Sequence, residues 1–494
     1  MKKFVTLALL LALLGAVVFA FTGCVKDDYP IEVGATEIVF YAYDFEDWSN
    51  EYMYNIVKEF NSNLEDGIQI KMMVYEDATY VTAIKSAREG GRAPDINMVS
   101  YGNLYQDVTK GYNASLAELM GQPAFDDILD NVLDMVTYDG KYYAYPQLVE
   151  PSSLLFYNKA MLKSANVTKE PAEWNFSDLL DACAKIKPTL KRSQYTIGLP
   201  TGFPLAWSTT GLQYNCNGKG VLNDNWDATN MSATINGSSE NYNSDNGYAN
   251  MMRLYWNLYA GGYVPSGNVS PTGYNDIIEA LCGEKLAMTF AGSWSVAEIM
   301  NTYPSMADNI GIAPIPTADG NKDGVTATNG GWTYAISSTS ELDKQQKAAT
   351  FLKWLLSDNA ERTAGFFKAA NYSKSAVNKS VNEYIAKDTS VSVNKEWIKV
   401  INSVASKSIP EPLYPFDISL KVASLFEWVS INADENKTST QVDNLFKSQL
   451  SNCVSEITKI INSSEIAGKN PKIAGTYPIE VGATEIVFYA YDFE

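Results

Sequence analysis

The sequence predicts an α/β protein built from two large lobes, with a parallel sheet covered by helices near its start. The chain has 494 residues, and domains usually span about 100–200 residues, so two large units are expected. A hydrophobic share of 46% and a charged share of 19% are ordinary for a globular protein with a sizeable core. The third observation is an alternation of strand and helix patterns, which is the order of a helix-covered parallel sheet.

The alternating elements lie between residues 37 and 99. Glu37–Tyr43 is a near-continuous apolar and aromatic run, typical of a buried strand. Ile68–Tyr75 and Asp95–Val99 are predicted as further strands, with helices over Ser49–Asn61 and Thr79–Glu89 between them. Ligands of such sheets bind beyond the carboxyl ends of the strands, so the loops that follow these strands are the expected place of a site.

Later segments continue the mixture of strands and helices. Strands are predicted at 284–291, 310–316 and 332–336, and helices at 248–259, 342–356, 418–429 and 442–461. Residues 215–250 are rich in Asn, Gly and Ser, which indicates long loops.

Charge and composition exclude several classes of function. The formal net charge is −19, which repels phosphate backbones and makes a nucleic-acid partner improbable. The chain contains no His, so catalytic triads that use His and His-based zinc sites are excluded. We expect neither a cofactor nor a metal site.

The N-terminus has the features of an export signal. Lys2 and Lys3 precede an apolar stretch over residues 4–21, and the sequence Phe-Thr-Gly-Cys ends at Cys24. These four residues resemble a bacterial lipobox, so residues 1–24 are interpreted as a lipoprotein signal peptide with Cys24 lipidated. The alternative is an uncleaved anchor helix, since the stretch is nearly long enough to span a bilayer. Both interpretations place the rest of the chain outside the cytoplasm, anchored to a membrane.

Four further cysteines are Cys183, Cys216, Cys282 and Cys453. Disulfides form outside the cytoplasm, but four cysteines allow three pairings and the sequence does not choose among them.

The C-terminus repeats an earlier segment. Residues 477–494 are identical to residues 29–46, and one strand position in a sheet cannot hold two copies. We interpret the second copy as an assembly artefact or a recent duplication. The alternative is a strand that swaps with the first copy or adds to the sheet edge of a neighbour.

Five short segments between Ile38 and Ile461 carry a family resemblance. They are Gly91–Asp95, Gly140–Pro146 with Tyr157–Lys159, Pro171–Asp178, Gly283–Met288 with Gly292–Trp294, and Pro314–Pro316 with Gly330–Trp332. In this order they resemble the family 1 extracellular solute-binding proteins, the class that includes the maltose-binding proteins.

The resemblance implies the two-lobed periplasmic-binding-protein fold of type II, with a mostly parallel sheet flanked by helices in each lobe. It also implies three hinge crossings, which we expect near Leu148–Ser152, Met288–Ala291 and Ala335–Ser338. The expected N-terminal lobe comprises residues 29–149 and 289–337, and the expected C-terminal lobe comprises residues 150–288 and 338–475. Closure of two such lobes around a ligand is a hinge-type switch.

A sugar has apolar C–H faces and a rim of hydroxyls, so aromatic planes beside carboxylates suit its recognition. Trp294 follows a predicted strand, and in family members the matching Trp stacks on sugar. Glu150 lies at the first expected crossing, where the family often places an acid that binds hydroxyls. Asp44, Trp48 and Tyr101 follow predicted strands, and Trp332 lies near an expected crossing. The last two candidates are Trp207, in a polar and aromatic stretch, and Tyr414, in a segment that resembles a family loop near the cleft.

The resemblance therefore implies a non-enzymatic, monomeric, extracytoplasmic binding component of an ABC importer. Its partners would be a carbohydrate and the permease subunits, and it would contact the membrane through its lipid anchor only. Two alternatives stay open. A receptor for a polyol phosphate is weakened by the acidic charge and the unclustered Arg residues. A secreted glycoside hydrolase needs two facing carboxylates about 5–9.5 Å apart, and no motif pairs them.

Overall fold

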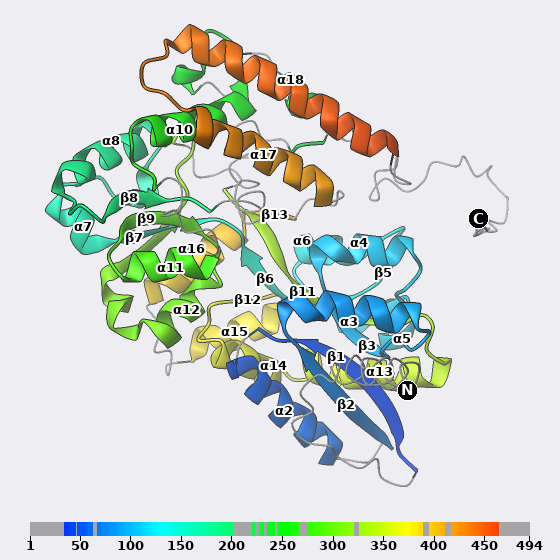
Figure 1. Cartoon of the computed structure of the whole chain (residues 1–494). Helices are drawn as coiled ribbons and strands as arrows, with labels where there is room; N and C mark the ends of the chain where they lie inside the picture. The colour runs from blue at the N-terminus through cyan, green and yellow to red at the C-terminus, as the bar shows by residue number, and fades with distance from the viewer. Residues whose placement is uncertain are drawn as a thin grey trace, which may run out of the picture.

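The structure, a computed structural model, describes residues 34–45, 47–62, 67–200, 220–222, 227–231, 235–242, 246–265, 274–320, 326–388, 395–410 and 416–463. Within these residues two main sheets lie in separate halves of the molecule, each with its own helices (Figure 1). Each half also has its own buried core. The predicted α/β architecture with two lobes is therefore confirmed.

The larger sheet belongs to the N-terminal lobe. Its strand order is β12–β6–β11–β3–β1–β2, and β13 pairs with β11. The bounds are β1 Thr36–Tyr43, β2 Ile68–Tyr75, β3 Ile96–Ser100, β6 Tyr145–Pro151, β11 Thr328–Ile336, β12 Ser375–Ala376 and β13 Ile409–Pro410. A small hairpin beside it pairs β4 Thr137–Tyr138 with β5 Lys141–Tyr142.

The parallel pairing predicted near the N-terminus is confirmed, because β1 pairs in parallel with both β2 and β3. The sheet as a whole is mixed rather than mostly parallel. The reason is β11, which enters from the other half of the molecule and runs antiparallel to both β3 and β6.

Alternating burial along β1 explains how this strand is held. Ile38, Phe40 and Ala42 are buried, whereas Tyr41 and Tyr43 are partly exposed. Phe40 packs against Phe351 of helix α13 (Leu342–Leu356), with ring centroids 6.2 Å apart. The helices of this half are α2 Asp47–Ser62, α3 Asp77–Glu89, α4 Tyr101–Thr109, α5 Leu116–Met120, α6 Asp130–Leu133, α13 Leu342–Leu356, α14 Ala360–Ala369 and α15 Lys379–Lys387.

The smaller sheet has the order β10–β7–β9–β8. Its bounds are β7 Leu154–Asn158, β8 Tyr195–Gly198, β9 Leu286–Ala291 and β10 Ile310–Pro314. Its helices are α7 Lys159–Ser164, α8 Phe176–Ile186, α10 Tyr248–Ala260, α11 Tyr274–Cys282, α12 Ser295–Thr302, α16 Lys395–Ala405, α17 Phe416–Asn432 and α18 Ser439–Ser463. Only β8 and β9 pair in parallel among these strands, so this sheet is also mixed.

The chain is divided between the halves differently from the expected boundaries. It leaves the larger sheet between β6 and β7, which agrees with the first expected crossing. It does not return at 288–291, because β7 pairs with both β9 and β10 and so keeps residues 310–314 in the smaller sheet. Nor does it leave at 335–338, since the buried side chains of α13 belong to the core of the larger sheet.

Three of the five cysteines lie in the described residues. Cys183, Cys282 and Cys453 are free and buried, and burial raises the pKa of each thiol to about 12. No disulfide therefore joins these three. Cys24, Cys216 and the repeat at 477–494 lie outside the described residues. In the described part of the chain, no helix has the length and apolar character needed to cross a membrane.

Candidate functional site

Four aromatic side chains gather where β1 ends, and we call them the aromatic cluster: Tyr43, Phe45, Tyr80 and Trp332. The Trp332 indole stacks on Tyr43, with ring centroids 3.9 Å apart and planes at 26°. Phe45 and Tyr80 approach the indole edge-on at 5.8 and 5.9 Å. The carboxyl ends of strands are where ligands bind in such sheets, so this cluster is a candidate ligand surface.

Trp332 is positioned by strand β11, which pairs on both sides. It lies opposite Ser100 of β3 and Leu148 of β6. Gly331 precedes it with φ 139°, and a Cβ added there would lie 2.3 Å from the Leu148 carbonyl oxygen. Only glycine fits this close approach, which explains the Gly-Gly-Trp sequence that marked this position.

A buried ion pair lies against the aromatic cluster. Lys374 Nζ is 2.5 Å from Glu150 Oε1, and the two side chains are only 5% and 7% exposed. Glu150 lies on β6, where it pairs with Gly330. The Lys374 ammonium also lies 5.0 Å from the centre of the Phe45 ring. The pair therefore neutralises two charges beside the aromatic surface.

Asp44 directly follows β1, between Tyr43 and Phe45. Its backbone N–H donates to the Tyr75 carbonyl oxygen at 3.0 Å. Its Oδ1 is buried and has no hydrogen-bond partner among the described residues. Buried polar atoms nearly always have partners, so this oxygen is available to a donor supplied by a ligand or by water.

Trp294 comes from the other half of the molecule. It follows β9 and stands at the start of α12, and its ring folds over Gly292, where an added Cβ would lie 1.9 Å from the indole. The neighbouring Ser293 N–H donates to the Pro151 carbonyl oxygen at 3.0 Å. This bond places the Trp294 segment beside the end of β6, one residue after Glu150.

Among the remaining sequence candidates, the structure describes the side chain of Tyr101. Tyr101 is 1% exposed, and its hydroxyl donates to the Leu148 carbonyl oxygen at 3.2 Å. Burial raises its pKa well above the ordinary value, and its hydroxyl is already bonded inside the core. Trp48 lies at the start of α2, with its side chain outside what is described, and Trp207 and Tyr414 also lie outside the described residues.

The sequence reasoning missed Tyr43, Phe45, Tyr80 and Lys374. Tyr43 and Phe45 flank Asp44 and share its signal, a position at the end of a strand. Lys374 had no such signal, because it lies 224 positions from Glu150 in the chain. Within the described residues, no group of three or more Cys, Asp or Glu side chains is placed to hold a metal ion.

Comparisons with known proteins concern the family and the fold. The model of a family described as bacterial extracellular solute-binding protein matches residues 46–362. The maltose-bound MalE3 protein of T. maritima aligns with a TM-score of 0.66 and 15% identity, over 86% of this chain and 100% of its own. The cyclic alpha-maltosyl-1,6-maltose binding protein of Arthrobacter globiformis gives 0.65 and 18%, over 86% and 100%. UgpB of Mycobacterium tuberculosis, in complex with glycerophosphocholine, gives 0.63 and 16%, over 86% and 99%.

At these identities the structural similarity concerns the fold. No curated protein sequence matches the chain.

Proposed function

Because the chain belongs to the family of bacterial extracellular solute-binding proteins, we propose that it binds a sugar or oligosaccharide between its two lobes and delivers it to an ABC importer. The family places the protein outside the cytoplasm. Two of the similar structures are named for maltose and for a cyclic maltosyl maltose, which supports a carbohydrate as the solute.

The observation that carries the proposal is the Trp332 indole in the aromatic cluster, together with a buried Asp44 oxygen that has no partner among the described residues, in the segment between Tyr43 and Phe45. Trp332 offers an aromatic plane of the kind that covers the C–H face of a sugar ring, and Asp44 Oδ1 accepts a hydrogen bond that a sugar hydroxyl can donate. A buried acceptor of this kind discriminates strongly, because leaving it unpaired costs about 1–3 kcal/mol.

The charges at the site favour a neutral guest. Lys374 is already paired with Glu150, and Asp44 adds a negative group. A phosphate group at this site would be repelled by the Asp44 carboxylate. Among the described residues, the cation beside the aromatic cluster is Lys374, and its charge is already paired. The polyol phosphate alternative is therefore disfavoured. The glycoside hydrolase alternative is disfavoured as well, since the family consists of binding proteins.

Further parts of the proposal rest on the sequence. Trp294 would cover the ligand from the smaller-sheet half, and Trp48, Trp207 and Tyr414 would complete the site. Cys24 would carry the lipid anchor, and the mature protein would act as a monomer that docks on the permease subunits.

A thermal-shift screen tests the function. The chain from residue 25 onward is mixed with monosaccharides, oligosaccharides and glycerophosphodiesters, and the unfolding midpoint is recorded. A specific ligand raises the midpoint by mass action. We expect carbohydrates to raise it. If phosphorylated polyols raise the midpoint and no carbohydrate does, the assignment is overturned. Steady release of smaller sugars from an oligosaccharide would establish a hydrolase instead.

Replacement of the unpartnered carboxylate should weaken binding selectively. We expect Asp44→Asn to lower the affinity for the sugar roughly ten- to a hundredfold, because a hydrogen bond to a charged group contributes about 1.5–3 kcal/mol. Isothermal titration calorimetry measures the change. Asp139→Asn is the matched control: this exposed Asp lies in the turn between β4 and β5 at φ 48°, which Asn tolerates. Equal affinity of Asp44→Asn and the unaltered protein would exclude Asp44 from the site.

A further inference from the structure

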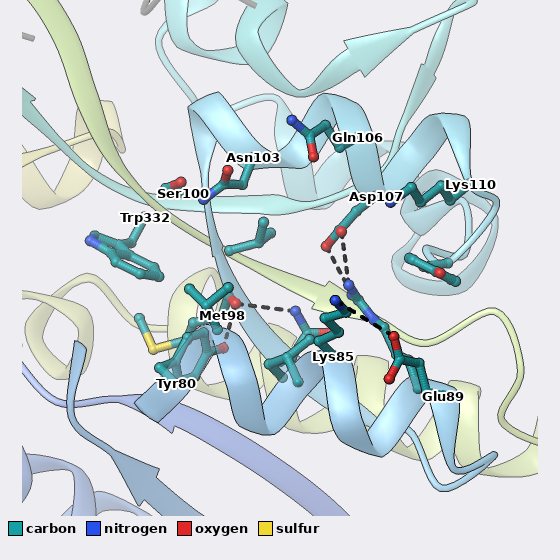
Figure 2. Close-up of a pocket in the computed structure, with 16 residues that line it drawn as sticks. Tyr80, Lys85, Glu89, Met98, Ser100, Asn103, Gln106, Asp107, Lys110 and Trp332 are labelled. Carbon is teal, nitrogen blue, oxygen red and sulfur yellow. Dashed lines mark hydrogen bonds and ion pairs between the residues drawn. The ribbon is translucent and has the colours of Figure 1, made fainter. Parts of the chain in front are cut away.

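A groove of about 250 Å³ runs over β3 between helices α3 and α4 (Figure 2). Tyr80, Ser100 and Trp332 line one end of it, and Glu89, Asp107 and Lys110 line the other. Tyr80 is near the start of α3, and Ser100 is the last residue of β3. The first end therefore lies at the carboxyl ends of the strands, and the second lies toward their amino ends.

The lining carries both apolar and polar side chains. The apolar ones include Val81 and Ile84 of α3 and Met98 and Val99 of β3, and the polar ones include the amides of Asn97, Asn103 and Gln106. Val81 is 61% exposed, one of the few large hydrophobic side chains left so open in the described residues. An apolar group that covers these apolar side chains would gain by leaving water.

Four of the five charged side chains that line the groove form ion pairs with one another, and the fifth is Lys110. Arg88 forms a two-pronged bond to Asp107, with both N–O distances at 2.8 Å. Lys85 Nζ lies 3.8 Å from Glu89 Oε1. With these four charges paired, we expect the apolar side chains of the lining to select the guest.

The groove is continuous with the aromatic cluster. Trp332 and Tyr80 belong to both, since each lines the groove and each contacts Tyr43. A ligand whose sugar ring lies on the cluster can therefore extend a substituent past the indole into the groove.

We propose that this groove receives the apolar aglycone of a bound glycoside, so that the solute class includes aryl or short alkyl glycosides. The inference rests on the proposed sugar-binding function and specifies the substrate class of the same site. The size is suitable, because a cavity of about 150 Å³ with apolar walls already binds benzene in another protein.

Paired glycosides test the inference. For each monosaccharide that raises the unfolding midpoint, the methyl and the phenyl glycoside are titrated by calorimetry. We expect the phenyl glycoside to bind about tenfold or more tightly, since burial of an aromatic ring of this size is worth at least that factor. Val81→Trp, which fills the groove, should remove this gain and leave the affinity for the methyl glycoside unchanged.

Thr82→Trp is the matched control, because Thr82 is an exposed neighbour on the same helix that does not line the groove. It should keep the phenyl preference. Equal affinities for methyl and phenyl glycosides would overturn the inference while leaving sugar binding intact. A phenyl preference that survives Val81→Trp would place the aglycone elsewhere. If neither glycoside nor any free sugar binds, the proposed function fails together with the inference.

Discussion

Trp332→Ala should weaken sugar binding by roughly 30- to 1,000-fold, which corresponds to about 2–4 kcal/mol. The indole stacks on Tyr43 at 3.9 Å and touches two further rings. Its removal takes away the aromatic plane proposed to cover the sugar and leaves the cluster with a gap. Titration calorimetry with the sugar found in the thermal-shift screen measures this loss.

A control separates this effect from a general loss of packing. Trp354 lies on α13, where it contacts Phe60 and stacks on Arg362. Trp354→Ala should lower the unfolding temperature and leave the affinity unchanged. If both variants weaken binding equally, or if Trp332→Ala binds as the unaltered protein does, the aromatic cluster is not the ligand surface.

Glu150→Gln should lower the free energy of unfolding by about 3–5 kcal/mol. The substitution leaves the Lys374 ammonium buried at 5% exposure without its carboxylate, and breaking a buried ion pair by removing one partner has a cost of this size. Urea unfolding at neutral pH measures the change.

The double variant Glu150→Gln with Lys374→Met tests the mechanism. It removes the unpaired charge as well, so we expect it to recover most of the lost stability. The exposed pair of Lys399 and Glu396, 2.8 Å apart, provides the comparison, because Glu396→Gln should change the stability by less than about 1 kcal/mol. If Glu150→Gln is as stable as Glu396→Gln, the buried Lys374 ammonium does not depend on the Glu150 carboxylate, and the prediction is contradicted.

Local patterns predicted most of the secondary structure and the type of fold. The runs at 37–43 and 68–75 became β1 and β2 in the parallel register that the alternation implied. The boundaries of the lobes were harder to predict, because they depend on which strands distant in the chain pair with one another. No local pattern shows that β10 pairs with β7, about 150 residues earlier in the chain, and that pairing keeps α12 in the smaller-sheet half.

The candidate site shows the same limit. Positions at strand ends and crossings indicated Asp44, Glu150 and Trp332. The structure places Trp332 in the aromatic cluster and the ion pair of Glu150 and Lys374 against Phe45, while Asp44 lies between Tyr43 and Phe45 in the chain. The same reasoning selected Tyr101, whose ring instead points into the core and bonds Leu148. A strand end fixes where the backbone goes, but the direction of the side chain depends on the packing around it.

Strand β11 is hydrogen-bonded to a neighbouring strand on each side, and this affects how a ligand binds. Hydrogen bonds to β3 and β6 hold the backbone on either side of Trp332, and Gly331 lets the two strands approach closely. The indole is therefore preorganised, and little conformational entropy is lost there on association. Selection among solutes then depends on the less constrained side chains that close over the bound sugar ring. Substitution of those side chains would alter specificity and leave strand β11 and its indole in place.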